Sequence, residues 1–191
     1  MKQEKIDYKN FFYPPGGILI WILILLELLT FGVALIVLAV SSKENPTAFL
    51  ASSSHLNATY GAVNTVFLLT SGFFMATTLH QFKQGNIKKA SLYLNITMAG
   101  GVLFLILKSI EYYEKIQLGF GLGYDTFFNF YWLLTGFHVI HILVGLVLLL
   151  FMKRGFAKQT SQLEDVEASA VFWHMCDLIW LVLFPVLYLV F

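Results

Sequence analysis

Five long apolar runs constrain this chain more than any other feature of its sequence. They lie at about 18–40, 61–80, 90–113, 126–152 and 170–191. Each run approaches the ~20 residues that an apolar helix needs to cross a bilayer core of about 30 Å. Because backbone amides in lipid must bond within their own helix, each run is expected to be a transmembrane helix. The sequence therefore predicts an all-α membrane protein, a bundle of five transmembrane helices.

Composition supports this fold class and excludes several functions. Charged residues make up 12% of the 191 residues, against about 25% in soluble proteins. The net charge of +1 gives no basic surface for nucleic acid. The single cysteine, Cys176, has no partner for an internal disulfide. Because the loops are short, we expect only a polar cytoplasmic arm at 1–13 and one transmembrane domain at 14–191.

The distribution of lysine and arginine predicts the orientation of the bundle. Three basic residues lie in each of the segments 1–13, 81–89 and 153–169, and one lies in each of the segments 41–60 and 114–125. Loops rich in lysine and arginine stay in the cytoplasm. We therefore expect the N-terminus in the cytoplasm and the C-terminus on the other, periplasmic side.

Several ionisable residues lie inside the apolar runs. In the last run, His174 and Asp177 are three residues apart and share a helix face. A carboxylate at mid-membrane costs about 2.5–3.5 kcal/mol, so Asp177 is expected to face protein. At 1.5 Å per residue, Glu27, His141 and Asp177 lie roughly 14, 16 and 10 Å from the cytoplasmic surface. We therefore hypothesise one buried polar cluster of five residues: Glu27, His138, His141, His174 and Asp177.

Small and polar residues at helical spacing indicate which faces of the spans contact other helices. In the fourth run the stripe is Leu134, His138, His141 and Gly145. In the second run it is Asn64, Leu68, Ser71, Met75 and Thr78, and the third run adds Asn95, Gly100 and Gly101.

Lys108 and Glu111 lie three residues apart near the end of the third run. We interpret them as an ion pair at the membrane interface, with the lysine reaching toward the headgroups and Tyr112 and Tyr113 as interfacial aromatic residues. The alternative is a functional site.

The histidines raise the question of a metal or haem. Two histidines three apart, with Glu27 and Asp177 at similar depth, form a conceivable ligand set. The Glu-x-x-His pattern of carboxylate-bridged metal bundles does not occur in the runs, and His174 lies at a different depth from His138. We therefore predict hydrogen bonds between helices, with no metal site and no catalytic residue in this chain. A proton relay is a further alternative.

Five motifs in order resemble subunit III of the haem-copper respiratory oxidases, over nearly all of 14–191. They are I-L-L-E-L-L-T-F at 24–31, V-N-T-V-F-L-L-T-S-G at 63–72, K-S-I-E-Y-Y-E at 108–114, L-T-G-F-H-V-I-H-I-L-V-G at 134–145, and F-W-H-M-C-D-L-I-W-L-V-L-F-P-V-L-Y at 172–188. Two further helices that begin the seven-helix members have no counterpart here. The runs P-P-G-G-I-L-I-W and F-F-N-F-Y-W-L-L-T-G-F-H look most like the five-helix accessory protein of nitric oxide reductase.

The resemblance implies a non-redox accessory subunit in a bacterial cytoplasmic membrane. Such a subunit supports the assembly, stability or proton-coupled electron transport of a catalytic partner. It holds no cofactor of its own, and haem, with or without copper, lies in the partner. A small multi-pass transporter and a membrane cytochrome with histidine-bound haem are the alternatives. The sequence leaves open whether the final acceptor is oxygen or nitric oxide.

Overall fold

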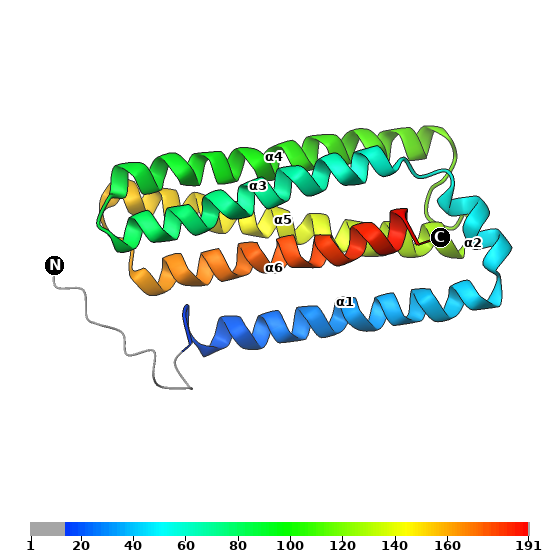
Figure 1. The fold of residues 1–191 in the computed structure, drawn as a ribbon, viewed down its shortest axis with the longest axis horizontal. Helices are drawn as coiled ribbons and strands as arrows, with labels where there is room; N and C mark the ends of the chain where they lie inside the picture. The colour runs from blue at the N-terminus through cyan, green and yellow to red at the C-terminus, as the bar shows by residue number, and fades with distance from the viewer. Residues whose placement is uncertain (1–13, 191) are drawn as a thin grey trace.

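The computed structural model describes residues 14–190, and all regular secondary structure in this part of the chain is helical (Figure 1). Its helices are α1 (Ile18–Glu44), α2 (Pro46–Ser53), α3 (Ala58–Lys83), α4 (Ile87–Gln117), α5 (Thr126–Lys158) and α6 (Leu163–Tyr188). The five long helices are each apolar enough to cross a membrane, which confirms the predicted spans. The short α2 is a sixth helix that the sequence analysis missed. The predicted arm at 1–13 lies outside the described residues.

The long helices extend beyond the predicted runs, because an apolar run marks the lipid core rather than the helix ends. Helix α3 begins where the side chain of Asn57 accepts a hydrogen bond from the Thr59 amide. Helix α5 begins where Asp125 accepts one from the Phe128 amide at 2.7 Å. Both side chains satisfy amides that have no partner within the first turn of a helix.

Helix α2 closes one end of the bundle. It begins with Pro46 in its first turn, where the missing amide proton costs nothing. The Phe49 ring meets the Phe127 ring edge-on at 5.8 Å. The Ser52 hydroxyl donates a hydrogen bond to the Asp125 carboxylate. Helix α2 is therefore fastened to the start of α5 by both apolar and polar contacts.

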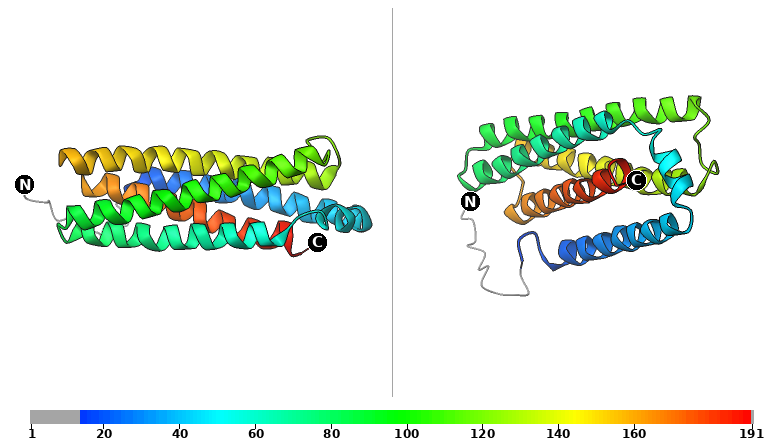
Figure 2. Two further views of the ribbon diagram at one scale, coloured as in Figure 1. Left: turned by 90° about the horizontal axis from the view of Figure 1, so that it is seen from above. Right: turned by 45° about the vertical axis from the view of Figure 1, so that its right-hand side comes forward.

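Helix α6 lies at the centre of the arrangement, although it comes last in the chain. It packs against α3, α5 and α1. Helices α3 and α4 run side by side as an antiparallel pair, and α1 packs against α5 and α6 (Figures 1 and 2). Helix α1 is the least buried of the five spans.

The two ends of the bundle differ in charge. The start of α1 lies at the same end as the α3–α4 and α5–α6 turns, and the C-terminus lies at the other end (Figure 1). We call the first the basic end, because Lys83, Lys88, Lys89, Lys153, Arg154 and Lys158 lie beside its two turns. The placement of the basic end in the cytoplasm stays a prediction.

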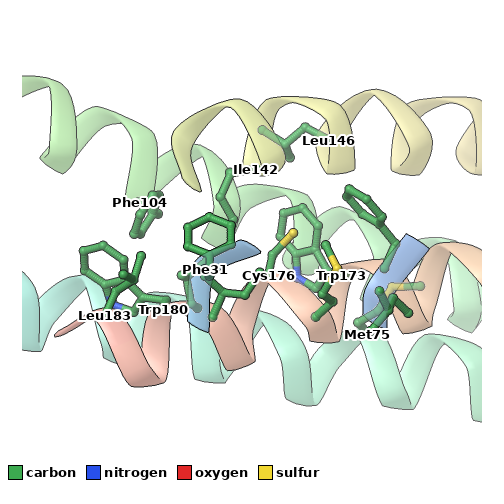
Figure 3. Close-up of a cluster of buried hydrophobic side chains, with 14 of the residues drawn as sticks. Phe31, Met75, Phe104, Ile142, Leu146, Trp173, Cys176, Trp180 and Leu183 are labelled. Atoms are coloured by element: carbon green, nitrogen blue, oxygen red, sulfur yellow. The ribbon is translucent and has the colours of Figure 1, made fainter. Parts of the chain in front are cut away.

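The core is built around two tryptophans of α6, Trp173 and Trp180 (Figure 3). A Cβ atom added at Gly101 or Gly145 would lie within 3.0 Å of the Trp173 ring, so both glycines provide space for that ring. The Trp173 indole donates a hydrogen bond to Ser71 Oγ at 3.0 Å, and Ser71 donates to the Thr97 carbonyl at 2.7 Å. One indole thus joins α3, α4, α5 and α6.

The predicted contact stripes of the second and fourth runs are confirmed. All five α3 residues of the stripe and all four α5 residues are buried. In the third run Gly101 is buried but Asn95 is exposed, so its assignment to a helix contact was wrong. Residues 94, 97, 101, 104, 108 and 111 form the buried face of α4, and position 95 lies off that face.

Candidate functional site

Glu27 and His141 meet at the contact between α1 and α5. His141 Nε2 lies 3.2 Å from Glu27 Oε2, and His141 Nδ1 donates a hydrogen bond to the Phe137 carbonyl at 2.8 Å. The rings of Phe31, Phe137 and Phe172 surround the imidazole. Because the carbonyl can only accept, Nδ1 is the donor in that bond, and Nε2 is the nitrogen that faces Glu27.

His138 is fully buried between α4, α5 and α6. Its Nε2 donates a hydrogen bond to the Cys176 carbonyl at 3.1 Å. The imidazole packs against the rings of Phe104 and Trp180, with centroids 5.4 and 5.3 Å away. This geometry fits a bond between α5 and α6, which is the structural role that the sequence favoured.

Asp177 lies at the contact between α6 and α3. Its Oδ2 is 3.5 Å from Nδ1 of His174, and the same oxygen occupies the space where a Cβ atom at position 72 would lie. The Asp177 carboxylate is buried, whereas 45% of the His174 side chain is exposed. Gly72 is thus the residue that lets the carboxylate fit between the two helices.

The five residues that were expected to form one buried polar cluster do not form one in the structure. The five residues lie in three places: Glu27 with His141, His138 alone against α6, and His174 with Asp177 against α3. Among residues 14–190, no ion pair joins the first pair to the second. Similar depth did not imply contact, because Asp177 and Phe172, which meets His141, lie on different faces of α6.

The close approach at Gly72 gives a direct prediction. We expect Gly72→Ala to destabilise the fold by about 1–3 kcal/mol, the usual cost of overpacking a fitted site. Gly136→Ala is the matched control, since nothing lies within 4 Å of a Cβ atom there. Thermal unfolding of the two purified variants in the same detergent measures the difference. Equal midpoints would contradict the assigned packing of Asp177.

Lys108 is the centre of a second polar site, nearer the opposite end of the bundle. Its ammonium group donates hydrogen bonds to Glu111 at 2.9 Å, to the Tyr188 hydroxyl at 2.7 Å and to the Tyr131 hydroxyl at 3.2 Å. Tyr188 in turn donates to Glu111 at 2.6 Å. The ammonium also lies 5.3 Å from the centre of the Trp180 ring. All three of its protons therefore have partners, from α4, α5 and α6.

The predicted ion pair between Lys108 and Glu111 exists, but it is buried inside the bundle, and the lysine does not reach toward the headgroups as expected. The side chains are 1% and 0% exposed, so the lysine does not reach out of the bundle. Helix α4 continues for nine residues past Lys108 to Gln117, or about 14 Å. The hydroxyls of Tyr131 and Tyr188 supply the polar surroundings that headgroups were expected to supply.

Three further polar residues of this site were missed. Lys115 is buried and donates a hydrogen bond to the His55 carbonyl at 2.6 Å, while Tyr60 donates to Glu114 at 2.6 Å. The spacing of Lys108, Glu111 and Lys115 places all three on one helix face, and this was the available signal. Their bonds connect α4 to the segment before α3 and to α3 itself.

Glu27 carries the second prediction. We expect Glu27→Gln to retain the contact with His141, because an amide offers both a donor and an acceptor. Glu27→Leu leaves His141 Nε2 without a partner and is expected to cost about 1–3 kcal/mol. The test is limited proteolysis of the α1–α2 connection in detergent. Faster cleavage in the leucine variant alone is the expected result, and equal rates would argue against a role of this pair in holding α1.

Most ring nitrogens of His138 and His141 contact other groups of the protein. One ring nitrogen of His141 and one of His138 are hydrogen-bonded to backbone carbonyls, and the other nitrogen of His141 faces Glu27. Within residues 14–190, no group of three or more His, Cys, Asp or Glu side chains is arranged to hold a metal ion. The polar sites as built fit hydrogen bonding between helices.

Comparison with known proteins identifies the family. Residues 55–190 match the model of the family described as cytochrome c oxidase subunit III. The cytochrome bo(3) ubiquinol oxidase subunit 3 of Buchnera aphidicola is 30% identical, over 89% of this chain and 84% of its own length. The cytochrome c oxidase subunit 3 of Thermostichus vulcanus is 30% identical over 66% of this chain, and that of Synechocystis is 33% identical over the same share.

The relatives differ in how much of their length is matched. The chain spans 64% of the Thermostichus protein and 55% of the Synechocystis protein, but 84% of the Buchnera protein. The matched region begins just before α3 and runs to the end of α6. It contains both histidines of α5, the His174–Asp177 pair and the Lys108 site. The chain belongs to the cytochrome c oxidase subunit III family.

Proposed function

We propose that this chain is a non-catalytic accessory subunit of a haem-bearing respiratory oxidase in a bacterial cytoplasmic membrane. The observation that carries the proposal is the family match across α3–α6, together with a relative named for a ubiquinol oxidase that matches over 84% of its length. The polar sites support it, because each joins helices of this chain to one another. Haem, with or without copper, belongs to the partner, and quinol oxidation is the favoured reaction of the complex.

The charge difference between the two ends of the bundle supports one orientation of the chain across the membrane. The lysines and the arginine at the basic end would face the cytoplasm, and the C-terminus would face the periplasm. The Lys108 site then lies in the periplasmic half of the membrane. The Glu27–His141 pair lies nearer the cytoplasm.

Nitric oxide reductase is the second candidate partner. The runs P-P-G-G-I-L-I-W and F-F-N-F-Y-W-L-L-T-G-F-H favour it, since they resemble its five-helix accessory form. In that case the chain would support denitrification rather than aerobic respiration.

Deleting the chain's gene in its own host tests the proposed role. Membranes lacking other terminal oxidases are compared with and without the chain, for quinol-driven oxygen consumption, nitric oxide consumption and haem content. We expect oxygen turnover to fall several-fold or decay faster, while haem remains. Loss of nitric oxide consumption instead would identify the second candidate. Unchanged rates of both would contradict an accessory role.

A further inference from the structure

Asn64 of α3 is a buried amide whose hydrogen-bonding groups are unused within the described chain. Its side chain is 0% exposed, and neither Nδ2 nor Oδ1 has a hydrogen-bond partner among residues 14–190. His138 and Asp177 also have one unpartnered buried atom, but their other polar atom contacts Cys176 or His174. Asn64 differs because both of its polar atoms lack a partner, although an amide offers two donors and an acceptor oxygen.

The polar neighbours of Asn64 on α3 are hydrogen-bonded. Thr65 donates to the Gly61 carbonyl at 2.8 Å and accepts a bond from the Trp180 indole at 3.0 Å. Thr78 donates to a carbonyl of its own helix. A buried amide without a partner is strongly destabilising, and native proteins rarely contain one. The contrast indicates that a bound molecule satisfies the Asn64 amide.

Asn64 lies level with Lys108 of α4. Helices α3 and α4 are antiparallel (Figure 1). Their register is fixed by two hydrogen bonds, from Ser71 to the Thr97 carbonyl and from Tyr60 to Glu114. Because both helices have the same rise per residue, interpolation between these bonds places Asn64 opposite position 108. Asn64 also shares the buried face of α3 with Ser71, two turns further along. The amide is therefore close to the Lys108 site, which consists of Lys108, Glu111, Tyr131 and Tyr188.

The Lys108 site has acceptor positions to spare but no free ammonium proton. The three ammonium protons bond to Glu111, Tyr131 and Tyr188. The Glu111 carboxylate accepts one bond from Lys108 and one from Tyr188, whereas its two oxygens offer about four lone-pair positions. A small molecule that accepts from the Asn64 amide and donates to this site would complete both.

We infer that a water molecule is bound between α3 and α4, where it accepts a hydrogen bond from Nδ2 of Asn64 and donates one to an oxygen of the Lys108 site. Buried waters typically make about three hydrogen bonds to otherwise unsatisfied groups. A neutral molecule fits best, because a cation would be repelled by Lys108 and an anion by Glu111. Lipid headgroups do not reach a residue that is 0% exposed. The water adds α3 to a site that already joins α4, α5 and α6, and this inference is independent of the accessory role.

Magnetisation transfer from water tests the inference directly. The full chain is purified in detergent with ¹⁵N in its asparagine and tryptophan side chains, and rotating-frame transfer from water to the Asn64 amide protons is measured. The Trp173 indole is the control, because it is equally buried and donates to the Ser71 hydroxyl, which reports transfer relayed through an exchanging hydroxyl. We expect transfer to Asn64 to be several-fold stronger than to Trp173. Equal transfer to both, or none to Asn64, would overturn the inference.

Substitution of Asn64 gives a second readout, in which the sign of the effect decides. Asn64→Leu removes the amide at similar volume, and we expect its unfolding midpoint to fall by about 2–4 °C, as for the loss of one hydrogen-bonded group in a chain of this size. Asn64→Ser keeps a donor and an acceptor and should lower the midpoint less. Asn95→Leu, on the exposed face of α4, is the matched control.

A higher midpoint in Asn64→Leu would overturn the inference, because removing a truly unpaired amide stabilises the fold. The serine variant also identifies the Asn64 signal by its loss from the spectrum. The water measurement therefore does not depend on folding of the leucine variant.

Discussion

Replacing Lys108 by methionine is expected to be one of the most damaging single changes in this chain. Removing one member of a buried ion pair leaves the other charge without its partner and costs about 3–5 kcal/mol. Here Glu111 would keep the bond from Tyr188 but lose its counter-ion, in a position with no access to solvent. Glu111→Leu should cost a similar amount, because it leaves the ammonium group of Lys108 without its carboxylate.

The double variant separates charge pairing from packing. Lys108→Met combined with Glu111→Leu removes both charges, and its cost should be well below the sum of the two single changes. Unfolding of the purified chain in mixed micelles, followed by circular dichroism, gives the three values. Lys88→Met, on the exposed surface at the basic end, is the control with the same substitution. Additive costs would show that the two side chains do not depend on each other.

Trp173→Ala is the second large expected effect. The change removes a fully buried ring that fits against Gly101 and Gly145 and the indole bond to Ser71. Large-to-small changes of this kind cost about 3–5 kcal/mol. The lost contacts should weaken the packing of four helices, because the Trp173 ring lies on α6 and contacts α3, α4 and α5.

Trp21→Ala is the matched control for that substitution. Trp21 lies on α1 with 44% of its surface exposed, and its indole donates to the Pro15 carbonyl. Its removal opens no cavity in the bundle, so we expect less than about 1 kcal/mol. Thermal unfolding of the two variants, monitored by the remaining tryptophan fluorescence, makes the comparison. Similar losses of stability in the two variants would mean that Trp173 is not the centre of the helix contacts.

The fold was predictable in its main features because lipid imposes simple rules. A run of ~20 apolar residues has few alternatives to a spanning helix, and the small and polar stripes of α3 and α5 marked their buried faces. The helix ends were less predictable, since they depend on caps such as Asn57 and Asp125. Helix α2 was missed because its short, mostly small and polar sequence carries no clear period.

The polar sites were only partly predictable from the sequence. The spacing of Lys108 and Glu111 predicted their ion pair, and the spacing of His174 and Asp177 predicted a shared face. Neither spacing indicates that the hydroxyls of Tyr131 and Tyr188 surround Lys108, because these lie 23 and 80 residues away. Depth alone grouped Asp177 with Glu27, whereas the rotation of α6 directs the aspartate toward Gly72. Depth follows from counting residues, but direction requires knowledge of neighbouring helices.

Purification of the tagged chain from its own host in a mild detergent is the first test of the proposed accessory role. We expect a haem-bearing catalytic subunit of a respiratory oxidase to co-purify, identified by mass spectrometry and by its visible absorption. The chain produced alone in a host without that oxidase should show no visible band. A haem band in the isolated chain would favour a membrane cytochrome. A colourless chain purified without any partner from its own host would contradict the accessory role and favour a transporter.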